Sequence, residues 1–171
     1  MKTVALFVAT TLAAAGCVLA MPTAALATPP ACGNASLVVS ASQDDSGMGH
    51  GSFVLRFRNK TTHACTLFGY PGLDALNASG GVMKHARRTL NGYAGGTTHG
   101  LQTIRVAPGR YASASVEWHN FNFSTGGSCR FSHSVAATPP NTSHTVQLAR
   151  SVSVCGLLVH PTVSGRSGSD R

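Results

Sequence analysis

The sequence has 171 residues, of which 43% are hydrophobic and only 11% are charged. Thirteen Lys and Arg residues against five Asp and Glu residues give a formal net charge of +8 at pH 7. This composition excludes a disordered acidic chain, and the absence of a sustained apolar heptad excludes a long coiled coil. The length predicts one domain.

The first 27 residues have the pattern of a secretory signal peptide. Lys2 supplies the positive start, residues 4–20 form an apolar stretch rich in Ala, and residues 25–27 form an A-x-A cleavage site. We therefore expect the mature chain to begin at Thr28 and to be secreted. The apolar stretch is at the short end of what a bilayer requires, so no transmembrane segment is expected in the mature chain.

Cys17 offers an alternative to cleavage after residue 27. The run Ala14-Ala15-Gly16-Cys17 resembles a lipoprotein signal, in which the cysteine carries a lipid that holds the protein at the membrane surface. The residues after Cys17 are still apolar, and a better A-x-A site follows them. Secretion is the prediction, and lipidation of Cys17 is its alternative.

Removal of the signal leaves Cys32, Cys65, Cys129 and Cys155. An even number of cysteines in an exported chain predicts two disulfides, but four cysteines allow three pairings and the sequence alone does not choose among them. We favour the sequential pairing of Cys32 with Cys65 and of Cys129 with Cys155. It closes loops of about 34 and 27 residues, each worth about 3.5–4 kcal/mol by loop entropy. A zinc site is not expected, because the cysteines do not come in C-x₂₋₄-C pairs.

The mature chain is predicted to form short strands separated by turns. Residues 52–58 place Phe53, Leu55 and Phe57 on one face, and residues 111–118 alternate apolar and polar side chains, so each strand should have one buried and one wet face. Further β-branched runs lie at residues 37–42, 101–106, 146–148, 152–154 and 157–163. Pro-Gly and Asn-Gly pairs mark turns between them.

Seven to nine short antiparallel strands in a secreted chain with two disulfides favour an all-β fold, a β-sandwich of two sheets packed face to face. We expect a single domain over residues 28–163, with Trp118 in its core, and a disordered tail at residues 164–171. Residues 80–100, rich in glycine, are expected to form a long connection or a weak edge hairpin.

The run from Asn59 to Gly72, NKTTHACTLFGYPG, carries a resemblance to a known family. Pro108-Gly109, Trp118, Cys129, Cys155 and Pro161 extend it. Over roughly residues 32–163 the chain resembles the actinobacterial secreted family catalogued as domain of unknown function 4232. The resemblance implies an exported, immunoglobulin-like β-sandwich, in some members anchored as a lipoprotein, with no established activity. The family has no assigned catalytic or ligand residues, so none is carried over.

No catalytic motif is recognisable, since the sequence contains neither a G-x-S-x-G elbow nor an H-E-x-x-H pair. Eight histidines are many for this length. Glu117 and His119 would point the same way from one strand, and with a histidine from a neighbouring strand they form the sharpest metal hypothesis. We nevertheless predict no metal and no cofactor, because scattered histidines on polar strand faces are usually solvated. Tyr70, beside Pro71, is interpreted as a corner residue rather than a ligand-stacking ring.

Lys84, Arg87 and Arg88 form the candidate basic patch, and Arg105, Arg110 and Arg130 add to the positive charge. Such a patch attracts anionic partners, so the expected partner is an anionic cell-wall component or an envelope protein. Solubility is the plain alternative. Nucleic acid is not expected, because export removes that partner and the basic residues are not interleaved with exposed aromatic residues.

Two classes of function remain open. The favoured class is a non-enzymatic binding module of the cell envelope or extracellular space, which contacts its partner through the loops at one end of the sandwich or through its basic face. The alternative is a hydrolase or a metal-dependent enzyme with an unrecognised site. An enzyme needs a concave pocket where several polar side chains converge, whereas a binding module can present only a flat charged face.

Overall fold

The computed structural model describes residues 27–170, which form strands joined by turns and loops. The predicted signal peptide at residues 1–27, apart from Ala27, and the alternative lipid site Cys17 lie outside the described residues. Within residues 27–170, no helix has the length and apolar character that crossing a membrane demands.

Fifteen strands are present in this range. In chain order they are β1 (Leu37–Ala41), β2 (Asp45–Gly47), β3 (His50–Asn59), β4 (Cys65–Phe68), β5 (Gly72–Leu76), β6 (Val82–His85), β7 (Arg87–Arg88), β8 (Thr103–Val106), β9 (Tyr111–His119), β10 (Phe121–Asn122), β11 (Gly127–Ser128), β12 (Ser134–Thr138), β13 (Val146–Leu148), β14 (Cys155–Val159) and β15 (Val163–Ser164). The number exceeds the seven to nine expected, because several strands have only two or three residues and show no alternating pattern.

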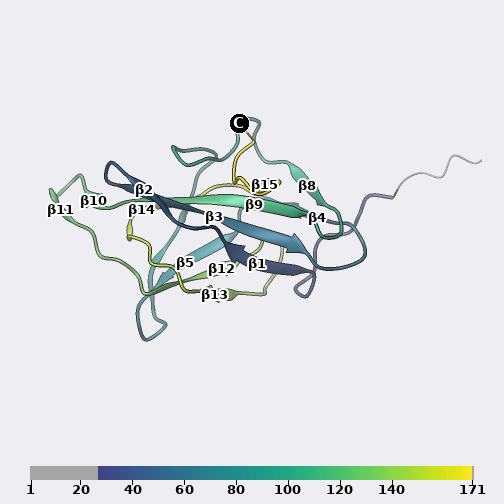
Figure 1. The fold of residues 1–171 in the computed structure, drawn as a ribbon, viewed down its shortest axis with the longest axis horizontal. Coiled ribbons are helices and arrows are strands. Elements are labelled where there is room, and N and C mark those ends of the chain that lie inside the picture. The colour runs from purple at the N-terminus through teal and green to yellow at the C-terminus, as the bar shows by residue number, and fades with distance from the viewer. Residues whose placement is uncertain (1–26, 171) are drawn as a thin grey trace, which may run out of the picture.

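Two main sheets form the two layers of the molecule (Figure 1). One sheet has the order β1-β3-β9-β14-β7, with β2 paired to β3 and β15 paired to β9, and the other has the order β13-β12-β5-β6. Two smaller ladders join β4 to β8 and β10 to β11. The pairing is antiparallel throughout these strands except between β7 and β14. The predicted all-β sandwich is therefore confirmed.

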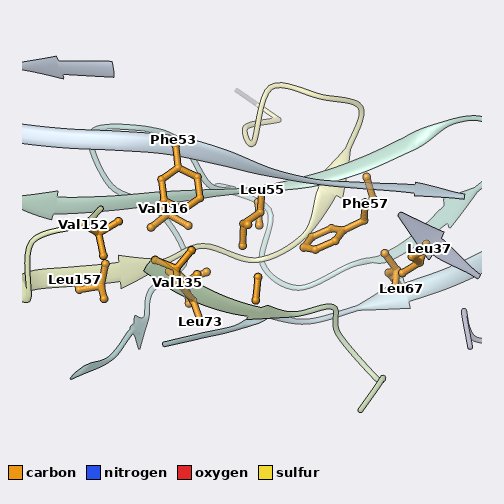
Figure 2. Close-up of a cluster of buried hydrophobic side chains, with 14 of the residues drawn as sticks. Leu37, Phe53, Leu55, Phe57, Leu67, Leu73, Val116, Val135, Val152 and Leu157 are labelled. Carbon is orange, nitrogen blue, oxygen red and sulfur yellow. The ribbon is translucent and has the colours of Figure 1, made fainter. Parts of the chain in front are cut away.

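The core lies between the sheets, and β3 contributes three of its large apolar side chains (Figure 2). Phe53, Leu55 and Phe57 have exposed fractions of 2%, 0% and 0%, as the alternation predicted. They face Leu73 of β5 and Val135 of β12, both also buried. Each side chain of this kind contributes about 1.5–3 kcal/mol when fully buried.

Trp118 belongs to the core, as expected, with only 4% of its surface exposed. Its indole N–H donates a hydrogen bond to Oδ1 of Asn120 at 2.9 Å, so the one polar atom of the ring is satisfied. The residue opposite it on β3 is Gly51, where a Cβ would overlap the indole ring. Glycine at position 51 is therefore required by the close approach of Trp118.

The disulfides have the predicted sequential pairing. Cys32 is bonded to Cys65, and Cys129 is bonded to Cys155. The first bridge fastens the start of the described chain to β4, where the N–H of Cys32 also donates to the carbonyl of Thr66 at 2.9 Å. The second fastens the segment after β11 to the start of β14.

Several strands differ from the sequence prediction. Residues 152–154 form only one isolated bridge, through Ser153, and the expected strand at residues 157–163 is divided into β14 and β15 around Pro161. Proline has no N–H to donate to a ladder, which explains the break. β4, β5 and β12 were not predicted, because their sequences CTLF, GLDAL and SVAAT contain few β-branched residues.

The segment after residue 163 is held against β9, where the sequence predicted a disordered tail. β15 pairs with Ser113 and Ala112, and the N–H of Gly165 donates to the carbonyl of Tyr111 at 3.0 Å. Further on, the N–H of Gly168 donates to Oγ of Ser113 at 2.9 Å. Glycine at position 168 permits this close approach, because a Cβ there would come within 2.3 Å of Oγ of Ser115.

Removal of either disulfide should lower the free energy of unfolding of the domain by several kcal/mol. Replacing Cys32 and Cys65 together by serine should lower the free energy of unfolding by about 3–4 kcal/mol, because the open chain gains loop entropy in the unfolded state. Chemical unfolding of the oxidised protein and of this double variant measures the difference. Unchanged stability in the double variant would contradict the structural role of the bridge.

Candidate functional site

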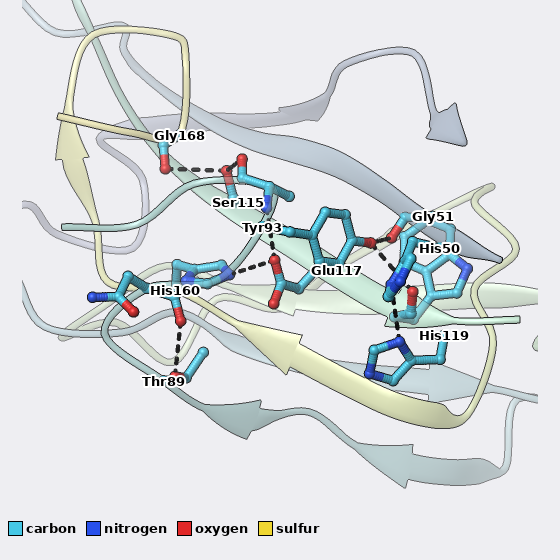
Figure 3. A network of polar contacts seen from close by, with 12 residues as sticks. His50, Gly51, Thr89, Tyr93, Ser115, Glu117, His119, His160 and Gly168 are labelled. Atoms are coloured by element: carbon cyan, nitrogen blue, oxygen red, sulfur yellow. Dashed lines mark hydrogen bonds and ion pairs between the residues drawn. The ribbon is translucent and has the colours of Figure 1, made fainter. Parts of the chain in front are cut away.

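The outer face of β9 is a buried polar row and not the wet face that the sequence predicted. Ser113 and Ser115 have exposed fractions of 0%, and Glu117 is 4% exposed. Residues 91–97 and residues 163–170 lie over this face and bond to it (Figure 3). Apolar and polar residues do alternate along β9 as predicted. The polar face is nevertheless buried, because two segments distant in the sequence cover it.

Glu117 is the charged residue of this row. Its Oε2 accepts a hydrogen bond from the N–H of Ala94 at 2.9 Å and lies 3.2 Å from Nε2 of His160. The imidazole is completely buried, and its Nε2 approaches the carboxylate without the alignment of a hydrogen bond. Burial raises the pKa of Glu117, but the His160 ring, the Ala94 N–H and the charge of His119 together bring this pKa below its ordinary value.

Ser115 connects both covering segments to β9. Its hydroxyl lies 3.0 Å from the carbonyl oxygens of Ala94 and Gly168 (Figure 3). Gly96 has a φ of 97°, and a Cβ there would come within 2.7 Å of Nδ1 of His160. The glycines of the 80–100 region thus allow the loop backbone to lie directly on buried side chains.

The polar row continues at the end of β9 into an aromatic cluster. His119 faces His50 of β3, its partner in the register, with 2.9 Å between the two Nδ1 atoms. Tyr93 lies beside them, with its ring centroid 4.6 Å from that of His50. Its hydroxyl donates toward the carbonyl oxygens of Gly51 and Trp118 (Figure 3).

The phenol of Tyr93 stays neutral at physiological pH. Burial raises its pKa to about 12, and the charges of Glu117 and Asp45 act in the same direction. A neutral phenol keeps its proton to donate to the two carbonyl groups of the sheet. Tyr93 therefore fastens the loop after Asn91 to the ends of β3 and β9 while half of its surface, 51%, remains exposed.

Two phenylalanines extend the cluster to the surface. Phe123 lies 5.1 Å from His119 and 5.9 Å from Phe121, measured between ring centroids. Their exposed fractions are 70% for Phe123 and 42% for Phe121. We call His50, Tyr93, His119, Phe121 and Phe123 the aromatic end. Exposed aromatic residues gathered at one place are typical of interaction sites.

A hollow of about 320 Å³ adjoins the aromatic end. Tyr93, His50 and Ser52 form one part of its lining, and the β2–β3 hairpin, with Asp45 and the fully exposed Met48, forms the rest. Met48 adopts a φ of 51°, which L-residues seldom do, so the hairpin presents its side chain outward on a constrained turn.

The predicted metal constellation is divided between two places. His119 does meet a histidine from the neighbouring strand, His50, whereas Glu117 turns to His160 and the loop N–H of Ala94. Within the described residues, no group of three or more His, Cys, Asp or Glu side chains is arranged to hold a metal ion. Two imidazoles alone are an incomplete ligand set.

The predicted basic patch lies on the edges of both sheets. Lys84 is on β6, at the edge of the smaller sheet, while Arg87 and Arg88 form β7, at the edge of the larger one. All three are exposed. Arg88 lies over the ring of Tyr70 at 5.8 Å, so this half-buried ring already has a partner within the chain.

Sequence reasoning missed His160, Phe123 and Met48. His160 lies within the β-branched run at residues 157–163, and nothing in that run indicates that its ring meets Glu117. Phe121 and Phe123 are two residues apart, the spacing that places side chains on one face of a strand, and this was the available signal. The encounter of His50 with His119 depends on the register of β3 and β9.

Glu117 should make the stability of the protein sensitive to acid. Because its folded pKa lies below the ordinary value of 4.5, the unfolded chain binds the proton first as the pH falls, and the stability contributed by the carboxylate is lost below that value. The stability advantage of the wild type over Glu117→Gln should therefore shrink from pH 6 to pH 3 in urea unfolding. Asp45→Asn, at an exposed position, is the control. A constant difference for Glu117→Gln would contradict the prediction.

Comparison with known proteins gives one family. The model of the family described as Domain of unknown function (DUF4232) matches residues 32–165. The search of curated proteins finds no match. Among solved structures, a β-glucosidase from Kluyveromyces marxianus aligns with 12% identity and a TM-score of 0.34, covering 73% of this chain and 15% of the enzyme chain. Similarity at this level indicates neither a shared fold nor a shared activity. On the family model, which covers most of its length, the chain belongs to the family Domain of unknown function (DUF4232).

Proposed function

We propose that the protein is an exported, non-enzymatic binding module that contacts a glycan component of the cell envelope through its aromatic end. The observation that carries this proposal is the exposed cluster of Tyr93, Phe121 and Phe123 around two histidines, beside a hollow. Export is supported by the two disulfides, which persist in oxidising compartments. The predicted signal peptide supports it as well.

The form of the aromatic end favours a glycan over a flat protein surface. A hollow of about 320 Å³ is at the small end of ligand pockets and suits a compact ring such as one sugar unit. Exposed aromatic rings offer an apolar face to the C–H side of a sugar. Asp45, Ser52 and His50 line the same hollow and supply hydrogen-bonding groups for hydroxyls.

The burial and the hydrogen-bond partners of the polar residues on β9 and at position 160 favour binding over catalysis. Ser115, Glu117 and His160 gather the residue types of a hydrolase, but all three are buried beneath the covering segments. The hydroxyl of Ser115 is directed to two carbonyl oxygens and not to the imidazole. A metal-dependent enzyme, the alternative, would need a further ligand beside His50 and His119.

The aromatic end should decide retention on envelope material. The amount of protein retained on insoluble envelope glycan should be about tenfold lower for the double variant Phe121→Ser with Phe123→Ser than for the wild type. The reason is that the two exposed rings are lost from the contact. Co-sedimentation with purified envelope fractions measures it. Phe68→Ser with Phe131→Ser is the matched control, since these phenylalanines are similarly exposed, at 46% and 49%, outside the cluster.

Three outcomes of this experiment would contradict the proposal. The first is an equal loss of retention in the two double variants, which would indicate non-specific hydrophobic adsorption. The second is full retention of the Phe121 and Phe123 variant with an unchanged melting temperature. The third is loss of retention after protease treatment of the envelope fraction, which would indicate a protein partner.

The basic patch should contribute a salt-sensitive attraction to anionic envelope polymer. Reversal of Arg87 and Arg88 to Glu should lower retention at low salt and have little effect at 0.5 M salt, because exposed charges are screened within about 8 Å already at 0.15 M. The melting temperature should not change, as both side chains are exposed. Reversal of Arg58 and Lys60, also exposed, is the control. Retention that is equal in both double variants would eliminate a specific role for the patch.

A further inference from the structure

A second hollow, of about 370 Å³, is lined by residues from β8, the start of β9 and the segment around β15. These three strands contact one another, and β8 and β15 lie close together in Figure 1. The lining of the hollow includes three arginines, Arg105, Arg110 and Arg166, together with Tyr111 and Ser164. Tyr111 begins β9 and His119 ends it, so the hollow and the aromatic end are separated by the length of this strand, about 26 Å. We call this hollow the arginine site.

The three arginines reach the arginine site from different parts of the chain. Arg105 comes from β8, and Arg110 follows a turn closed by its own N–H and the carbonyl of Ala107 at 3.0 Å. Arg166 follows β15, and its guanidinium lies 4.3 Å from the ring centroid of Tyr111. Nε of Arg56 donates to the carbonyl of Arg166 at 3.2 Å, which fixes the backbone at this point.

No carboxylate of the described residues balances this charge. Asp74 pairs with His85, Asp44 lies 3.9 Å from Arg150, and Glu117 pairs with His160. None of the five acidic residues lines the hollow, and its three guanidinium groups form no ion pair within residues 27–170. Three arginines around one hollow, with no carboxylate in its lining, are complementary to an anion.

We propose that the arginine site binds a phosphate group carried by a larger molecule. The planar guanidinium presents several N–H donors in a fork that matches the oxygens of phosphate, and three such groups balance a charge greater than one. The hollow is larger than a phosphate, so the molecule that carries the group extends along it. Ser164 offers a hydroxyl at its edge. This site is independent of the glycan contact at the aromatic end.

Isothermal titration calorimetry of the oxidised protein with glycerol 3-phosphate tests the proposal. Saturable binding is expected, and Arg105→Gln with Arg110→Gln should weaken it by tenfold or more, because each arginine supplies charge-assisted hydrogen bonds. Arg130→Gln with Arg150→Gln, two arginines outside the lining of the hollow, is the matched control and should bind as the wild type does. Glycerol 3-phosphate should also raise the melting temperature of the wild type, because a ligand that binds only the folded state stabilises it.

The probes distinguish the source of the phosphate. Tighter binding to vesicles containing phosphatidic acid than to glycerol 3-phosphate would assign a lipid headgroup, and equal binding would assign a soluble phosphate. Equal binding of citrate at matched ionic strength would overturn the choice of phosphate. Equal weakening in the two double variants, or no saturable binding of any phosphate probe, would overturn the site itself. The glycan contact is tested separately, by the retention of the Phe121 and Phe123 variant on envelope glycan. The glycan proposal and the phosphate proposal can therefore fail independently of each other.

Discussion

The structure depends on the burial of both faces of β9. One face packs Val116 and Trp118 into the apolar core, and the other carries Ser115 and Glu117, which are also withdrawn from water. A buried carboxylate without partners would cost several kcal/mol. The N–H of Ala94 and the ring of His160 therefore have to be in place beside Glu117, and this requirement positions the loop and the C-terminal segment that supply or adjoin them.

The same requirement builds the aromatic end. Once Ala94 is held by Glu117 and Ser115, the preceding residue, Tyr93, lies over the ends of β3 and β9 and bonds to their carbonyl oxygens. Its ring then stands beside His50 and close to the hollow. The surface to which we assign ligand contact is thus a direct extension of the buried polar row, and damage to the row should loosen that surface.

At the opposite end of β9, the C-terminal segment has a comparable double role. Gly168 approaches Ser115 closely enough that only glycine fits without displacing its neighbours, while Arg166 two residues earlier rests on Tyr111. One short segment therefore covers polar groups of the strand and brings a third positive charge to the arginine site. Both proposed contact surfaces rely on chain segments that have little apolar content and are held mainly by hydrogen bonds.

The sequence by itself determined the fold class and the inward faces of β3 and β9, because these depend on local alternation. It favoured the sequential disulfide pairing without excluding the other two, and the structure decided among the three. The sequence also indicated that Glu117 and His119 share a face. Only the tertiary structure decided that this face is covered, that His160 meets Glu117, that His50 meets His119, and that Arg105, Arg110 and Arg166 converge. These encounters join residues far apart in the chain through strand register and through a glycine-rich loop whose path has no periodic signal, so no local pattern could reveal them.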